Sequence, residues 1–199
     1  MSTMNSELSE ELAHAFKAVR NSVVASLGHY QIWFTLRGEG KAWESHLDDM
    51  NDHRVVDFFR ATIIAHYRMM FIEIACLFDS GETSHGIRFL KTKMRRAGLN
   101  DIADRFDDEL KPFGSLVSHI KTVRSKVVAH KDVGVDEKSL YKKHGIKPNE
   151  IGRLMKTTAI LMRDLEDTLK TKSSTVWLTD RWENATFGML GLLKSGRSS

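Results

Sequence analysis

The stretch VVDFFRATIIAHYRMMFIEIACLFD, Val55 to Asp79, decides the fold. Drawn as a helix, it is apolar on nearly all sides, because Phe, Ile, Met, Ala and Leu fill most of its positions. A helix that is hydrophobic all round is normally buried by its neighbours. The stretch therefore predicts the central helix of an all-α domain, ending at the turn Asp79-Ser80-Gly81.

Helical patterns continue on both sides of this stretch. Residues 6–36 begin with capping and acidic residues, repeat apolar residues at helical spacing and stop at the turn RGEG, Arg37 to Gly40. Strand-like alternation is nearly absent. Further helices are predicted over 84–98, 100–130, 137–145 and 149–172, with a short amphipathic piece at 41–50 and a final helix from about Thr179. The helix over 100–130 is expected to be bent or split at Pro112 and Gly114. We predict an up-and-down helical bundle forming a single domain over residues 1–199.

The composition favours a soluble protein of the cytoplasm. Of the 199 residues, 41% are hydrophobic and 28% are charged, which suits a packed core and not a disordered chain. The single cysteine, Cys76, cannot form an internal disulfide, and its apolar surroundings predict that it packs as a small hydrophobe. No apolar run approaches the roughly 20 residues that cross a bilayer, and the polar N-terminus is unlike a secretory signal. We expect no membrane contact.

The positive charge is concentrated in the middle of the chain. Residues 1–87 carry 7 basic and 12 acidic groups, residues 88–147 carry 15 and 8, and residues 148–199 carry 8 and 6. A local positive field attracts an anionic polymer such as RNA. The alternative is that these basic clusters are only solvated helix faces and ends.

Two similar stretches each hold an arginine six residues before a histidine. They are RATIIAHYR, with Arg60 and His66, and RSKVVAHKD, with Arg124 and His130. With 14 arginines and nine histidines, roughly two such pairs are expected by chance, so the context has to distinguish them. Arg60 and His66 lie inside the central helix, which predicts a structural role, with His66 bonded to a neighbouring carboxylate and Arg60 reaching outward.

Arg124 and His130 fall instead in the last turns of a helix that runs into a polar loop within the basic part of the chain. On an ideal α-helix they lie about 120° apart around the axis and about 9 Å apart along it, at opposite margins of an apolar stripe. One helix cannot easily direct both side chains at one small group, but two copies related by a two-fold axis can share them in one cleft. The alternative is that His130 only ends the helix and that Arg124 pairs with an acidic residue of a neighbouring helix.

RSKVVAHKD on the late helix of an all-helical domain resembles the HEPN superfamily, which is marked by an arginine four to six residues before a histidine. FFRATIIAHYRMMFIEIACLFD resembles the central helix of its abortive-infection (AbiU-type) branch. The resemblance covers about residues 40–172. It implies a HEPN-like core there, extra helices at both ends, and a C-terminal amphipathic appendage at 173–199.

The resemblance also implies a function. HEPN domains dimerise so that two arginine–histidine motifs meet, and many are metal-independent endoribonucleases of toxin–antitoxin and abortive-infection systems. Carried over, Arg124 clamps the phosphate and His130 acts as general acid and base, while Lys126, Lys131 and Ser125 contact RNA. The chemistry needs neither metal nor cofactor, since RNA carries its own nucleophile. The expected partners are RNA, a second copy of the chain and, as in toxin members, a cognate antitoxin.

Two other interpretations stay open. Active HEPN members often carry Asn, Asp or His directly after the arginine, where this chain has Ser125. The first alternative is therefore a catalytically silent HEPN-like module that binds RNA, a nucleotide or a protein partner. The second is a helical interaction protein in which the motif is accidental.

Other polar groups carry weaker signals. Glu73 lies on the same helix face as His66, and a buried carboxylate needs a partner, either His66 or a basic group of another helix. His46 and His53 lack a third ligand at metal-binding spacing. Aromatic residues of the tail predict core packing or dimer contact, and they are Trp177, Trp182 and Phe187.

Overall fold

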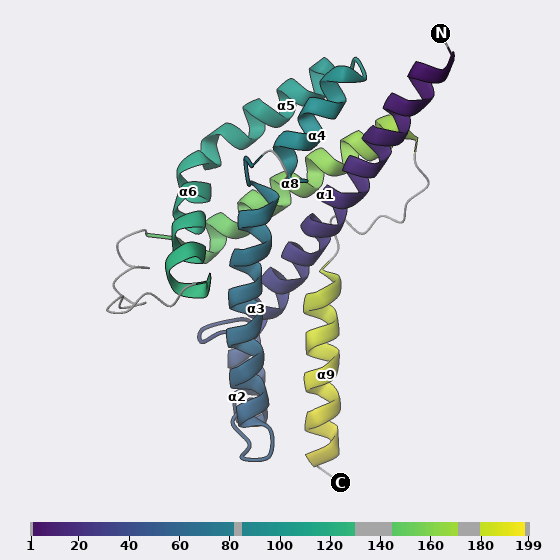
Figure 1. Ribbon diagram of the computed structural model, residues 1–199. Coiled ribbons are helices and arrows are strands. Elements are labelled where there is room, and N and C mark those ends of the chain that lie inside the picture. The colour runs from purple at the N-terminus through teal and green to yellow at the C-terminus, as the bar shows by residue number, and fades with distance from the viewer. Residues whose placement is uncertain (1, 82–84, 130–144, 171–179, 198–199) are drawn as a thin grey trace.

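The computed structural model describes residues 2–81, 85–129, 145–170 and 180–197, and every regular element within these ranges is a helix (Figure 1). The prediction of an all-α helical bundle is confirmed. None of the helices in these ranges combines the length and the hydropathy needed to cross a bilayer.

The helix ends follow the local sequence signals. The elements are α1 (Ser2–Leu36), α2 (Trp43–Met50), α3 (Val56–Leu77), α4 (Ile87–Arg96), α5 (Asn100–Leu110), η1 (Lys111–Phe113), α6 (Gly114–Val123), η2 (Arg124–Ala129), α8 (Pro148–Leu169) and α9 (Arg181–Arg197). α1 ends directly before the turn at Arg37, and the predicted helix over 100–130 is split at Pro112, which lies in the 3₁₀ turn η1. Most of the predicted helix over 137–145 lies outside the described residues.

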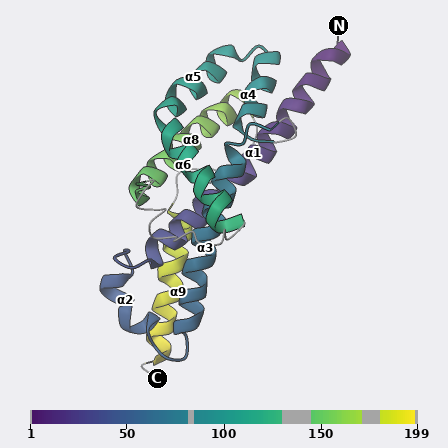
Figure 2. The same ribbon diagram turned by 60° about the vertical axis from the view of Figure 1, so that its left-hand side comes forward.

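The main hydrophobic core lies where α1, α3, α4, α6 and α8 meet. α1 and α3 run side by side, and α8 crosses behind them (Figures 1 and 2). Side chains from all five helices are buried here, including Val19, Phe71, Leu90, Ile120 and Leu154. Burial of each large aliphatic or aromatic side chain contributes about 1.5–3 kcal/mol. This core fixes the positions of α3, which carries RATIIAHYR, and of α6, which runs directly into Arg124 of RSKVVAHKD.

α9 closes a second, smaller core at the other end of α1. Leu190 of α9 is buried against Leu36 and Phe59, with Phe187 packed beside them. The side-chain oxygen of Gln31 accepts hydrogen bonds from the first backbone N–H groups of α9, and Trp182 packs against Gly28. The predicted core packing of Trp182 and Phe187 is therefore confirmed, while Trp177 lies outside the described residues.

The prediction that the central helix is buried by its neighbours is wrong for part of its surface. On α3, Phe58 is 60% exposed, Ile64 51% and Met69 36%. Cys76 is also exposed, so its predicted role as a buried hydrophobe is wrong. α1, α6 and η2 pack against other parts of α3. Residues at positions i, i+3, i+7, i+11 and i+18 share one side of a helix. Five exposed residues of α3 have this spacing, and we call them the exposed α3 face: Phe58, Ala61, Ala65, Met69 and Cys76.

Gly152 of α8 is required by its contact with α1. A Cβ at this position would approach the Tyr30 hydroxyl and would lie 2.9 Å from the ring carbon that carries it. We expect Gly152→Ala to lower the free energy of unfolding by about 1–2 kcal/mol, because overpacking costs about 1–3 kcal/mol and exceeds the roughly 0.5–1 kcal/mol gained from helix propensity. Urea unfolding followed by circular dichroism measures this change.

The matched control is Gly188→Ala in α9, where a Cβ meets nothing within 4 Å. At this position only the higher helix propensity of alanine acts. This variant is therefore expected to be more stable than wild type by about 0.5–1 kcal/mol. Equal effects of the two substitutions would contradict the contact between Gly152 and Tyr30.

Candidate functional site

The motif RSKVVAHKD begins where α6 changes into a π-helix. Arg124–Ala129 form this wider turn, η2, which packs against α3. π-helical turns are rare in proteins overall, but those that occur are often found at functional sites. The separation of 120° and 9 Å expected for Arg124 and His130 assumed an α-helix, so it does not apply across this segment. His130 and Lys131 lie outside the described residues.

Arg124 lines a small cavity at the end of α3. The cavity measures about 150 Å³, and its lining comes from α3, the turn after it, α6 and η2: Ala75, Cys76, Asp79, Lys121 and Arg124. We call it the Arg124 cavity. The Nε atom of Arg124 is buried and has no hydrogen-bond partner among the described residues. An ion pair between Arg124 and a neighbouring acidic residue, the alternative raised from the sequence, is not found among them either.

Asp79 is the acidic residue of the cavity lining, and its carboxylate accepts hydrogen bonds from its own turn. Its Oδ1 accepts hydrogen bonds from the backbone N–H groups of Ser80, at 2.7 Å, and Gly81, at 3.3 Å. These bonds hold the carboxylate toward its own turn. The C-terminal end of α3 adds the negative end of its dipole, which favours cations nearby. The structure thus brings Arg124 and Lys121 to one cavity without neutralising the arginine by an ion pair within the described chain.

The predicted RNA-contacting residues Ser125 and Lys126 are both exposed. They follow Arg124 directly and present their side chains to solvent, where they are accessible to a polyanion. Cys76 and Asp79, which line the cavity together with Arg124, were not predicted as its neighbours. They are more than 40 positions away in the chain, so no local spacing reveals the contact.

In RATIIAHYR, the structure gives His66 a different partner from the one predicted. His66 Nδ1 lies 2.8 Å from His29 Nδ1 of α1, so a single hydrogen bond joins two imidazoles, and the predicted bond to a carboxylate is wrong. Arg60 reaches outward as predicted, with a side chain 72% exposed and 3.7 Å from Asp57. Burial raises the pKa of Glu73, which forms no ion pair with His66 in the described structure.

The histidine pair predicts a loss of stability in weak acid. Burial lowers the pKa of both His29 and His66, and for His66 the neighbouring His29 lowers it further. The unfolded chain therefore binds more protons than the folded chain below a pH of about 6.5. The contribution of the pair is complete above that pH and is lost as the pH falls toward the lowered pKa values. Urea unfolding between pH 7.5 and 5 is expected to show this decline.

The variant His66→Gln removes one titrating group and is expected to flatten the pH dependence. His53→Gln is the control, because the His53 side chain is 91% exposed. A stability curve of His66→Gln that keeps the full wild-type slope below pH 6.5 would contradict the assignment to this pair.

The remaining histidines of interest do not form a metal cluster in the described part of the chain. His46 Nδ1 lies 3.0 Å from the carboxylate of Asp49, an i,i+3 pair within α2. Within residues 2–81, 85–129, 145–170 and 180–197, no group of three or more His, Cys, Asp or Glu side chains is arranged to hold a metal ion.

Comparison with known proteins identifies a family. The family model HEPN_AbiU2, described as AbiU2, matches residues 9–183. The matched region begins inside α1 and ends inside α9, so it includes both motifs and the Arg124 cavity. No curated protein and no solved structure matches the chain.

Proposed function

The chain belongs to the AbiU2 family of HEPN domains, and on that premise we propose that it is a metal-independent endoribonuclease whose active site forms between two copies of the chain. In this proposal Arg124 and His130 are the catalytic residues, and Ser125, Lys126 and Lys131 contact RNA. The setting is that of a cytoplasmic toxin or phage-defence effector, held in check by a cognate antitoxin where one is present.

The observation that carries the proposal is the state of Arg124. A buried guanidinium nitrogen normally has a hydrogen-bond partner, because an unpaired one costs about 1–3 kcal/mol or more. Arg124 Nε has none in the described chain, and the Arg124 side chain is part of the lining of a cavity of about 150 Å³. A phosphate group supplies the missing acceptor, and its planar pairing with a guanidinium is bidentate.

The cleavage chemistry follows from RNA itself. The 2′-hydroxyl attacks the adjacent phosphorus, the bond to the 5′-oxygen breaks, and the products carry a 2′,3′-cyclic phosphate and a 5′-hydroxyl. A histidine near its ordinary pKa moves the proton from the nucleophile or to the leaving oxygen. Arg124 stabilises the negative charge that develops on the phosphoryl oxygens.

The exposed α3 face supports a second copy as partner. It presents Phe58 and Met69 to solvent and ends at Cys76, which also lines the Arg124 cavity. An apolar strip on the central helix of a domain is typical of a protein interface. Packing of two such faces buries both strips and brings the edge of the interface to Arg124.

The position of the two-fold axis decides whether the two arginines meet. If two α3 helices packed antiparallel with their crossing at Ala65, the two Cys76 residues would lie about 33 Å apart, at 1.5 Å per residue. Two Arg124 cavities would then be too distant to share one phosphate. A shared site therefore requires an axis that runs along α3 or crosses it close to Cys76.

The direct test is cleavage of RNA by the purified chain in the presence of EDTA, with the ends of the products identified. Cleavage that leaves 2′,3′-cyclic phosphates is expected. Binding of RNA without cleavage would support the silent module instead, and cleavage that stops on chelation would contradict the metal-independent mechanism.

A further inference from the structure

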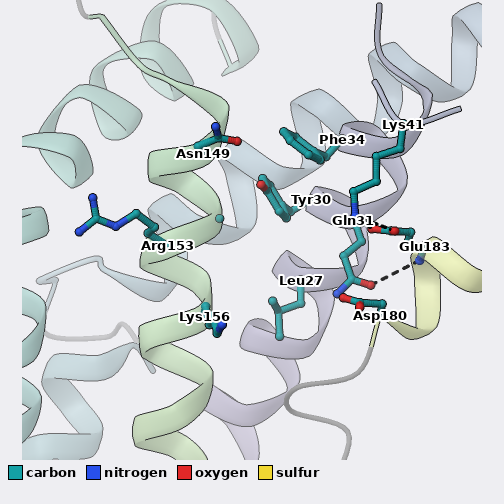
Figure 3. Close-up of a pocket in the computed structure, with 11 residues that line it drawn as sticks. Leu27, Tyr30, Gln31, Phe34, Lys41, Asn149, Arg153, Lys156, Asp180 and Glu183 are labelled. Carbon is teal, nitrogen blue, oxygen red and sulfur yellow. Dashed lines mark hydrogen bonds and ion pairs between the residues drawn. The ribbon is translucent and has the colours of Figure 1, made fainter. Parts of the chain in front are cut away.

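A cavity away from Arg124 lies between α1, α8 and α9 (Figure 3). It measures about 550 Å³, which is within the range of small-molecule sites. Its three walls differ in chemistry: α1 presents aromatic rings, α8 presents cations, and the start of α9 presents carboxylates. We call it the aromatic cavity.

The aromatic wall is held in place from two sides. The rings of Tyr30 and Phe34 are stacked, with centroids 5.3 Å apart and planes 22° apart. The guanidinium of Arg37, which is not part of the lining, lies 4.7 Å from the centre of the Phe34 ring. On the other side, Tyr30 is pressed against Gly152 of α8. A rigid aromatic wall offers a planar group a surface that needs no reordering on binding.

The α8 wall carries two cations that no described acidic group neutralises. Arg153 and Lys156 are exposed, lie three residues apart and form no ion pair within the described chain. In Figure 3 Arg153 extends from α8 to the side away from the rings, at the rim of the cavity. An anion at this rim is reached by rotation of an exposed side chain, which breaks no described ion pair.

The α9 wall has the opposite charge, and part of it is already neutralised. The carboxylate of Glu183 is bound by Lys41, with 2.7 Å to each oxygen, which leaves Asp180 as an exposed carboxylate. Asp180 suits hydroxyl or amino donors of a ligand and repels a continuous polyanion. The cavity therefore fits one planar group with one anionic end better than a nucleic-acid backbone running through it.

We propose that the aromatic cavity binds a single nucleotide unit, with its base against Tyr30 and Phe34, its phosphate at Arg153 and Lys156, and its sugar hydroxyls toward Asp180. A free nucleotide is the expected ligand, and a nucleotide within a single RNA strand, which presents the same base, sugar and phosphate, is the second source that the experiment distinguishes. Burial raises the pKa of Tyr30 to about 12, so its hydroxyl remains a hydrogen-bond donor at neutral pH. This site does not depend on the ribonuclease activity proposed for Arg124.

Calorimetric titration of the full chain tests the proposal with three probes: adenosine 5′-monophosphate, uridine 5′-monophosphate and a single-stranded RNA hexamer carrying 2′-O-methyl groups, which cannot be cleaved. Wild type is expected to bind at least one of them. The double variant Arg153→Glu with Lys156→Glu is expected to raise the dissociation constant at least tenfold. Phe34→Leu, which keeps an apolar side chain but removes the ring, is expected to raise it about fivefold to a hundredfold.

Lys17→Glu is the matched charge control, because Lys17 is exposed on α1 and is not part of the cavity lining. It is expected to bind as wild type does, and thermal unfolding checks that every variant is folded. Binding of the mononucleotides assigns the site to free nucleotides, and binding of the hexamer alone assigns it to RNA when the variants at Phe34, Arg153 and Lys156 weaken it. No binding of any probe, or unchanged binding by the folded variants at Phe34, Arg153 and Lys156, overturns the proposal.

Nucleotide binding at the aromatic cavity and RNA cleavage at Arg124 are tested independently of each other. Arg124→Ala is expected to leave nucleotide binding at the aromatic cavity unchanged, because Arg124 is not part of its lining. Loss of nucleotide binding in Arg124→Ala would show that the probe occupies the Arg124 cavity instead, and would overturn the assignment to the aromatic cavity.

Discussion

RNA cleavage is expected to fall by about 10²–10⁴ in His130→Ala and by about 10²–10³ in Arg124→Ala, while both variants remain folded. The first value is the usual contribution of a general acid or base, and the second is that of a charge-stabilising group in the transition state. Single-turnover cleavage of a labelled RNA, with protein in excess, measures the chemical step directly. Arg124→Lys is expected to recover only part of the activity, because a lysine keeps the charge but cannot pair with two phosphate oxygens at once.

The chain supplies its own control for this experiment. RATIIAHYR has the same arginine–histidine spacing. Its Arg60, however, is exposed and forms an ion pair with Asp57, and its His66 is hydrogen-bonded to His29. Arg60→Ala is expected to leave cleavage within about twofold of wild type, because an exposed ion pair contributes little. Equal losses from Arg60→Ala and Arg124→Ala would refute the assignment of catalysis to the second motif. Undiminished cleavage in His130→Ala would refute it as well.

The second large effect is expected at the exposed α3 face. Phe58→Asp combined with Met69→Asp is expected to convert a dimer into a monomer and to reduce cleavage to the level of the Arg124→Ala variant. Each of these side chains contributes about 1.5–3 kcal/mol to the free energy of dimerisation when it is fully buried. Because the dimer is symmetric, each substitution is present in both copies and its effect occurs twice. The dissociation constant is therefore expected to rise at least about 100-fold. Sedimentation velocity over a range of concentrations measures it.

Leu192→Asp in α9 is the matched control for this surface. Leu192 is 75% exposed but lies outside the exposed α3 face, so its substitution is expected to leave the oligomeric state unchanged. A wild-type chain that stays monomeric at high concentration while cleaving RNA would contradict the shared active site. A dimer that survives both aspartates would place the interface on another surface.

Local features of the fold were predictable because they depend on neighbours in the sequence. The end of α1 at Leu36 follows from the glycine-containing turn after it, and the break between α5 and α6 follows from Pro112. Both signals act within a few residues through backbone conformation and missing hydrogen-bond donors. The π-helical form of Arg124–Ala129 was not predictable from the apolar pattern, which is the same for either type of helix.

The errors concern the surroundings of side chains. The apolar residues of α3 predicted a helix buried by its neighbours, but the helices that pack around it leave Phe58 and Cys76 exposed. In the same way, the partner of His66 is His29, which lies 37 positions away and has no sequence signal that links it to the motif.

The sequence by itself determined an all-helical chain, the ends of most of its helices, and two candidate motifs, of which RSKVVAHKD stands at a helix end within the basic part. Tertiary structure decided the surroundings of each motif: packing of η2 against α3 brings Arg124 to a cavity with Cys76 and Asp79, while packing of α1 against α3 pairs His66 with His29. The physical reason is the range of the interactions. Backbone hydrogen bonds and capping act between residues close in the chain, whereas burial, ion pairing and cavities depend on which helix faces meet.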